Sequence, residues 1–114
     1  MQKILAVYLL SNKHRTVYYV GVTNDLERRL IEHYQNACLN NMKTFTGRYQ
    51  CYYCLVYENI IGPMNAIHRE KEVKGWRREK KLEWARTLNP DLHFLNNEIL
   101  GKGWEETYHP AKPR

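Results

Sequence analysis

The chain has 114 residues, 43% of them hydrophobic, and a formal net charge of +6. A chain of this length fits one domain that buries enough apolar surface to fold without disulfides or a structural metal. Its longest apolar run, Ile4–Leu10, is far shorter than the roughly 18 residues of a membrane span, and no cleavable signal pattern precedes it. We therefore expect a cytoplasmic protein without a membrane segment.

The three cysteines are an odd number without the spacing of a disulfide framework, which favours a reducing compartment. Cys51 and Cys54 have the spacing of a redox or metal motif. However, they fall in a strand-like run, where residues three apart face opposite ways, and no second ligand pair accompanies them. We expect neither a metal nor a redox site there.

Two β-rich runs, Ile4–Leu10 and Thr16–Val22, are joined by a polar stretch and predict a hairpin. If the residues next to the loop pair with one another, Tyr8 lies opposite Tyr19. The two phenols would then stand side by side on one face of the sheet.

A helix is predicted over about residues 24–36, with Asn24 as its cap. At 100° per residue, Arg29 and His33 border the apolar stripe of this helix, whereas Arg28 points away from it. We therefore expect Arg29 and His33 to lean towards the sheet.

Residues 38–48 are rich in Asn, Lys, Thr and Gly and predict a mobile connection to a third strand at about 51–57. Pro63 suits the first turn of a second helix, which Gly75 interrupts before a third helix at about 77–87.

The order β-β-α-β-α-α predicts a small α/β (α+β) domain, in which helices flank a three-stranded antiparallel sheet. We assign this domain to residues 1–95. Residues 96–114 predict a loosely ordered C-terminal tail of unknown role.

Glu70 is the most informative position, because its neighbours on the predicted helix face are apolar: Ala66, Ile67 and Val73. A carboxylate directed at the interior is costly unless it is paired or functional. It can form a buried ion pair with an arginine, or it can serve as a metal ligand or catalytic carboxylate. The second interpretation is favoured because four chemically useful side chains are expected to face the same layer: Tyr8, Tyr19, Arg29 and His33.

One carboxylate without a partner cluster suits a single Mg²⁺ or Mn²⁺ ion, held mainly by water and by substrate phosphate oxygens. An arginine can stabilise the negative charge of a phosphorane-like transition state. A tyrosine or histidine hydrogen-bonded to water can help to deprotonate the nucleophile. These groups together point to the hydrolysis of a phosphodiester.

The segment from Arg69 to Lys81 holds seven basic and three acidic residues, a local charge of +4. Such a segment is either a solvated helix face or a surface for a polyanion. If the partner is nucleic acid, we expect its phosphates to contact seven basic side chains: Lys43, Arg48, Lys74, Arg77, Arg78, Lys80 and Lys81.

The chain resembles the GIY-YIG nuclease domain. The first motif stands here as Ala6-Val7-Tyr8, with alanine in place of the first glycine, and the second stands as Tyr19-Val20-Gly21. The helix that follows carries Arg29, at the place of the family's arginine, and His33, which matches a histidine of the homing endonucleases.

Within that family, the chain is most similar to small free-standing members that resemble the N-terminal domain of the excision-repair nuclease. This likeness rests on FTGRY at residues 45–49, on AIHREKEVKGWRREKKLEW at residues 66–84 and on Asn89-Pro90. The resemblance implies that Glu70 binds the divalent metal and that Asn89 supports the site. Gly21 would let the backbone turn tightly from the strand into the helix.

The resemblance implies a divalent-metal-dependent endonuclease that cuts DNA, in repair or processing. Tyr8 or Tyr19 would position or activate the water, Arg29 would bind the scissile phosphate, His33 would assist proton transfer and Glu70 would hold the metal. Two alternatives remain: a nucleic-acid-binding module without turnover, and a protein-interaction domain with a vestigial fold.

Overall fold

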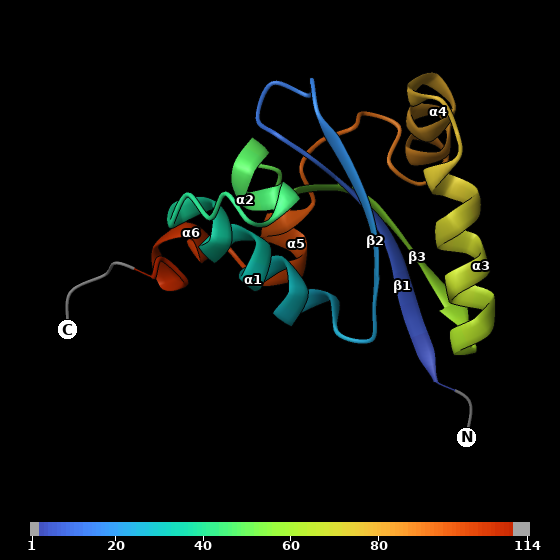
Figure 1. Cartoon of the computed structure of the whole chain (residues 1–114), viewed down its shortest axis with the longest axis horizontal. Coiled ribbons are helices and arrows are strands. Elements are labelled where there is room, and N and C mark those ends of the chain that lie inside the picture. Colours follow the sequence, from blue (N-terminus) through green and yellow to red (C-terminus); the bar gives the residue numbers. More distant parts are fainter. Residues whose placement is uncertain (1–2, 111–114) are drawn as a thin grey trace.

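The computed structural model describes residues 3–110. Along the chain the elements are β1 (Ile4–Ser11), β2 (Tyr18–Thr23), α1 (Leu26–Cys38), α2 (Phe45–Tyr49), β3 (Tyr53–Ile61), α3 (Pro63–Lys74), α4 (Arg78–Leu88), α5 (Asn96–Leu100) and α6 (Trp104–Thr107). The strands form an antiparallel sheet in the order β2-β1-β3, which confirms the predicted α+β fold. Helices α1, α2, α5 and α6 lie on one side of this sheet, and α3 and α4 lie on the other (Figure 1). Within residues 3–110, no helix is long and apolar enough to span a bilayer.

The central strand β1 is buried on both faces. Val7 and Leu9 belong to an apolar cluster with residues of α3 and α4, whereas Tyr8 and Leu10 pack in a second cluster with Leu30 of α1. Because successive residues of a strand point to opposite faces, this alternation divides the core into two layers and places Tyr8 on the α1 side.

The β1–β2 hairpin differs in register from the sequence prediction. Tyr8 is paired with Gly21, and Tyr19 is paired with Leu10. In the loop, the Asn12 side chain accepts hydrogen bonds from two backbone N–H groups, so these residues form a structured turn and the strand starts later. A shift of two residues keeps every side chain on its expected face. The two tyrosines therefore share a face, as predicted, but lie diagonally.

The cap of helix α1 lies one residue later than expected, at Asp25 and not at Asn24. The Asp25 carboxylate accepts a hydrogen bond from the backbone N–H of Arg28 at 3.1 Å. The helix continues to Cys38 and buries Leu30, His33 and residues of the following turn.

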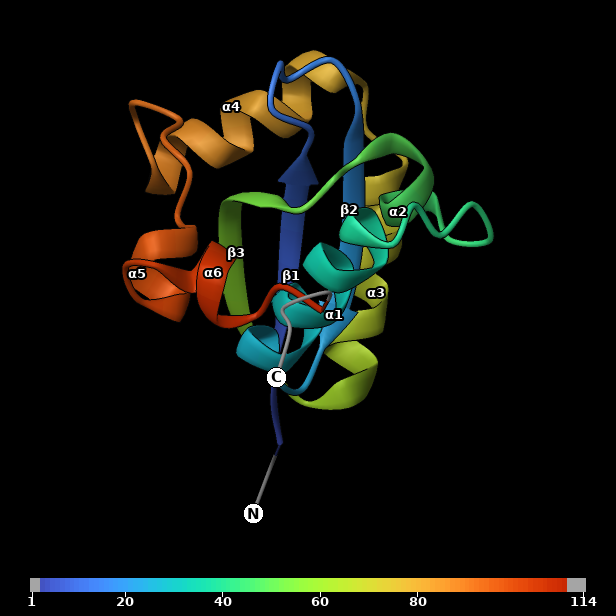
Figure 2. The ribbon, with the colours of Figure 1, turned by 90° about the vertical axis from the view of Figure 1, so that its left-hand side faces the viewer.

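The connection after α1 is more ordered than its composition suggested, since it ends in the short helix α2. The Thr44 hydroxyl caps this helix by accepting from the N–H of Gly47 at 3.0 Å. A Cβ at Gly47 would overlap the carbonyl oxygen of Asn41, so only glycine fits there. The segment projects from the domain beside β2 (Figure 2).

The prediction of a loosely ordered C-terminal tail is wrong for residues 96–110, which the structure describes. Trp104 of α6 is buried edge-on against Tyr34 of α1, with ring centroids 4.9 Å apart. The Asn96 side chain accepts from the backbone N–H of Cys54 in β3 at 2.8 Å. The division of the chain at residue 95 stays a prediction.

The two cysteines of the spaced pair are core residues. The Cys51 thiol donates to the Val17 carbonyl at 3.3 Å, and Cys54 is fully buried beside Leu10 and Tyr8. Burial raises the pKa of both thiols to about 12, so neither is a thiolate at neutral pH.

Candidate active site

His33 joins β1 to α2 through two hydrogen bonds in the interior. Its Nε2 lies 2.9 Å from the hydroxyl of Tyr8, and its Nδ1 lies 2.8 Å from the hydroxyl of Thr46. All three side chains are buried. A neutral imidazole, with one nitrogen donating and the other accepting, satisfies both contacts.

The Tyr8–His33 pair is uncharged at neutral pH. Burial lowers the pKa of His33 to about 3, and the nearby Arg29 cation contributes to this shift. Burial also raises the pKa of Tyr8 above its ordinary value; Tyr19 adds to this shift and Arg29 opposes it. Arg29 is therefore the cation that acts on both members of the pair.

Tyr19 stands at the outer side of this pair. Its ring lies 5.3 Å from that of His33 and 6.3 Å from that of Tyr8, between centroids, and it also contacts Phe45 of α2 at 5.8 Å. Tyr19 is half-buried, and its hydroxyl makes no hydrogen bond to any residue in the range 3–110. This hydroxyl is therefore available to water or to a substrate.

Gly21 has a role that the sequence interpretation missed. It lies inside β2, opposite Tyr8, and not at a turn into the helix. A Cβ at this position would overlap the Tyr8 hydroxyl, lie 2.5 Å from its Cζ and approach the ring of Tyr19 to 3.0 Å. The glycine is needed because it leaves the space that the tyrosine occupies.

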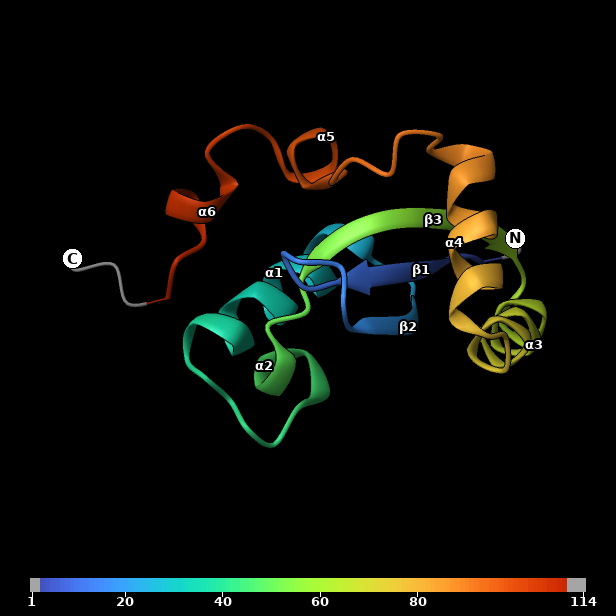
Figure 3. The ribbon, with the colours of Figure 1, turned by 90° about the horizontal axis from the view of Figure 1, so that it is seen from above.

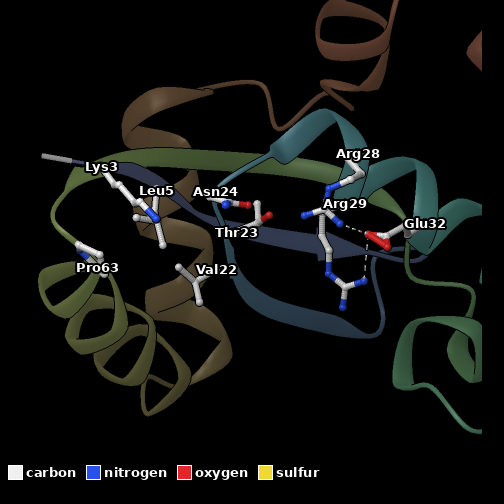
Figure 4. A pocket seen from close by; sticks show the side chains of 9 residues that line it. All are labelled: Lys3, Leu5, Val22, Thr23, Asn24, Arg28, Arg29, Glu32 and Pro63. Atoms are coloured by element: carbon white, nitrogen blue, oxygen red, sulfur yellow. Dashed lines mark hydrogen bonds and ion pairs between the residues drawn. The ribbon is translucent and has the colours of Figure 1, made fainter. Parts of the chain in front are cut away.

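A groove of about 480 Å³ crosses the edge strand β2, between α1 and the start of α3 (Figure 4). Its lining residues are Lys3, Leu5, Val22, Thr23, Asn24, Arg28, Arg29, Glu32 and Pro63. Arg29 lies at the α1 end with its side chain 35% exposed, and its guanidinium is 3.7 Å from the Glu32 carboxylate. Arg28 is 54% exposed and is bound more closely to Glu32, at 2.8 Å. Only Arg29 therefore reaches both the groove and the Tyr8–His33 pair.

Glu70 lies on α3, where its side chain is 17% exposed between the buried Ala66 and Val73. It faces inward, as predicted, and forms an ion pair of 3.3 Å with Lys74. The expectation that it shares a layer with Tyr8 is wrong, because α3 packs on the opposite face of the sheet (Figure 1). The two faces meet at the edge strand β2, which has α1 on one side and α3 on the other (Figure 3).

One interpretation of Glu70 is a buried ion pair with an arginine. The structure instead forms an arginine ion pair between the adjacent Arg69 and Glu58. Arg69 donates to the Glu58 carboxylate at 2.7 Å, and the Trp84 indole N–H donates to the same carboxylate at 3.2 Å. The hydrogen bond from Arg69 is the main reason why the pKa of Glu58 is lowered. Arg69 therefore holds α3 against β3 and α4, and Glu70 is not part of that network.

The described residues offer a metal ion isolated ligands and no cluster of them. Within residues 3–110, no three His, Cys, Asp or Glu side chains come together as a cluster. A zinc or calcium site would take most of its ligands from protein. Single carboxylates such as Glu70, the ligand that the sequence predicts, suit an ion that keeps several waters and binds substrate phosphate, as Mg²⁺ does.

The basic residues predicted to bind nucleic acid fall into two groups on opposite sides of the sheet (Figure 1). Lys43 and Arg48 are exposed beside and on α2. The others lie on or between α3 and α4: Lys74, Arg77, Arg78, Lys80 and Lys81. Arg78 already donates to the Thr16 carbonyl at 2.9 Å and lies over the Tyr18 ring, which ties α4 to the hairpin.

Asn89 is buried at the end of α4, on the β3 side of the domain. Its side-chain amide donates to the carbonyls of Leu55 and His93, both at 2.8 Å. These bonds hold the turn after α4 against β3. The structure does not bring Asn89 to the Tyr8–His33 pair.

Thr46 is the site residue that sequence reasoning missed. It belongs to the FTGRY segment, which supports the family resemblance, but nothing local marks its hydroxyl as a partner of His33. The contact exists only because α2 folds back onto α1.

A family model described as the GIY-YIG catalytic domain matches residues 5–83. This range spans β1 to the middle of α4 and holds both tyrosines, Arg29, His33 and Glu70. Comparison with curated proteins and with solved structures gives no match.

Proposed function

The chain belongs to the GIY-YIG catalytic domain family, a family of nucleases, and we propose that it is an endonuclease that hydrolyses DNA with one divalent metal ion. The observation that carries this proposal is the arrangement around Arg29. The partly exposed Arg29 cation stands at a groove and acts on the uncharged Tyr8–His33 pair. The ring of Tyr19, whose hydroxyl makes no hydrogen bond within residues 3–110, lies against that pair. We place the activity in the cytoplasm, in the repair or processing of DNA.

Arg29 binds the scissile phosphate in this proposal. Its only ion-pair partner in residues 3–110 is Glu32, at a weak 3.7 Å, so a phosphate can replace that contact at little cost. A guanidinium stabilises the additional negative charge of the transition state.

Tyr8 and His33 provide a route for a proton. If His33 carries its proton on Nδ1 and donates it to Thr46, its Nε2 accepts from the Tyr8 hydroxyl. Tyr8 can then take a proton from an attacking water while it passes its own to Nε2. Burial is the main cause of the low pKa of His33, and the Arg29 cation adds to it. The negative charge of a bound phosphate offsets the part that is due to Arg29, which favours the transfer.

Tyr19 orients the water or a phosphate oxygen through its unbonded hydroxyl. Glu70 is the residue that would hold the metal, from the α3 side of the edge strand. When bound, a divalent cation polarises the phosphate and stabilises the charge on its oxygens. The edge strand β2 lies between α1, which carries Arg29, and α3, which carries Glu70 (Figure 3), so a DNA strand bound along this edge would pass between the two helices.

The test is single-turnover cleavage of labelled single-stranded, duplex, nicked and branched DNA, with RNA of the same sequence as a comparison. We expect cleavage with Mg²⁺ or Mn²⁺, none with chelator, and restoration when metal is added back. Binding should weaken with a log-log salt slope of roughly −0.9 for each duplex phosphate contacted. Salt-sensitive binding without cleavage of any substrate would instead identify a nucleic-acid-binding module.

A further inference from the structure

Two aromatic rings of α2 are exposed beside the candidate active site. Phe45 and Tyr49 are 43% and 44% exposed, and their ring centroids lie 4.8 Å apart. Phe45 also contacts Tyr19 at 5.8 Å. Tyr19, Phe45 and Tyr49 thus form a row of rings, here called the aromatic row, which leads from the site to the surface.

The surface around the aromatic row is basic. Lys43 and Arg48 line a hollow of about 270 Å³ together with Phe45 and Tyr49, and no acidic residue contributes to that lining. Neither cation forms an ion pair with any residue in the range 3–110. The charge of this hollow therefore suits an anionic partner.

The rings are held by an anchored helix. Thr46, between the two rings in sequence, is hydrogen-bonded to the active-site His33 at 2.8 Å, and Thr44 caps the helix. The segment projects from the domain in two perpendicular views (Figure 2, Figure 3). More than two fifths of each of these two residues stays exposed, and their fixed display beside two cations without an ion pair in the described residues is typical of an interaction site.

We propose that Phe45 and Tyr49 stack on unpaired bases of the strand that enters the active site, while Lys43 and Arg48 contact its phosphates. This inference rests on the proposed function and names its substrate class: DNA that is single-stranded next to the scissile phosphate. Aromatic rings within a basic groove bind single strands of any sequence, because every base has a π face to stack on. In a closed duplex those faces are covered by neighbouring bases.

The experiment measures binding of a single-stranded oligonucleotide that contains 2-aminopurine, and of the same oligonucleotide in a duplex. Tyr49→Ala removes a ring that contacts only Phe45 among the rings described, and Tyr49→Phe keeps that ring. Leu88→Ala, at an exposed apolar residue of α4, is the matched control. Circular dichroism confirms that each variant is folded.

We expect the wild type, Tyr49→Phe and Leu88→Ala to quench the 2-aminopurine and to bind the single strand alike. Tyr49→Ala should lose quenching and bind it about fivefold or more weakly, with duplex affinity unchanged. Single-strand binding by Tyr49→Ala that equals the wild type, or a wild-type preference for duplex, overturns the inference. Cleavage is scored on the same samples: wild type that quenches but cuts no substrate refutes the proposed nuclease activity and leaves the stacking intact.

Discussion

Gly21 of β2 lies directly opposite Tyr8 of β1, and the space left by its missing side chain is filled by the tyrosine ring. The hydroxyl of this ring lies 2.9 Å from Nε2 of His33, within hydrogen-bond distance. Gly21 of the second sequence motif therefore positions Tyr8 of the first motif, because it has no side chain in the space that the tyrosine ring occupies.

Gly21→Ala should therefore displace Tyr8 and lower both stability and cleavage. The added methyl group overlaps a buried ring, and overpacking of this kind costs roughly 1–3 kcal/mol. Gly75→Ala is the control, because a Cβ there would meet nothing closer than 3.5 Å. Urea unfolding and single-turnover cleavage of both variants check this. Equal stability of the two variants would show that Tyr8 does not need the space.

Arg29 and Arg28 are adjacent and carry the same charge, but only Arg29 acts on Tyr8 and His33. Arg29→Ala should reduce the single-turnover rate by about a hundredfold or more, the scale of losing one donor to a transition-state charge. Arg28→Ala should reduce the rate only a few-fold at low salt and less at high salt, because Arg28 acts only through the overall electrostatic field of the protein, which salt screens. Equal losses in the two variants would contradict the proposed role of Arg29.

The buried neutral state of His33 should make the protein less stable as the pH falls from 7 to 5. The unfolded chain takes up a proton near pH 6.5, whereas the folded protein excludes it until about pH 3. The unfolded state therefore binds more protons in this window, and the free energy of unfolding should fall by about 2 kcal/mol on account of this residue.

Urea unfolding at both pH values checks the prediction. His33→Gln should lose this part of the pH dependence, while His68→Gln, at an exposed histidine, should keep it. The same pH dependence in all three proteins would mean that His33 is protonated in the folded state.

The order of the elements and the inward faces of the helices could be predicted from the sequence, because both depend on local periodicity. Periodicity correctly places Arg29 and His33 towards the sheet, and Glu70 inward on α3. It does not say which face of the sheet a helix covers, so the expectation that Glu70 shares a layer with Tyr8 is wrong.

The other points at which the structure differs from the sequence prediction also depend on contacts between segments that are distant in the chain. The hairpin register depends on how Asn12 closes the loop, and a pattern of period two is unchanged by a shift of two residues. The roles of Thr46 and Trp104 depend on segments that fold back onto α1. None of these contacts has a local signal.

The most direct test of the account is the single-turnover cleavage of DNA by Glu70→Gln in Mg²⁺, measured beside the wild type and Glu72→Gln. Glu72 is an exposed carboxylate of the same helix and pairs with Arg69, so it controls for the loss of one negative charge. We predict that Glu70→Gln abolishes cleavage, keeps its fold and binds DNA as tightly as the wild type or more tightly, while Glu72→Gln remains active. Cleavage by Glu70→Gln at the wild-type rate would contradict the proposed metal ligand and with it the proposed site.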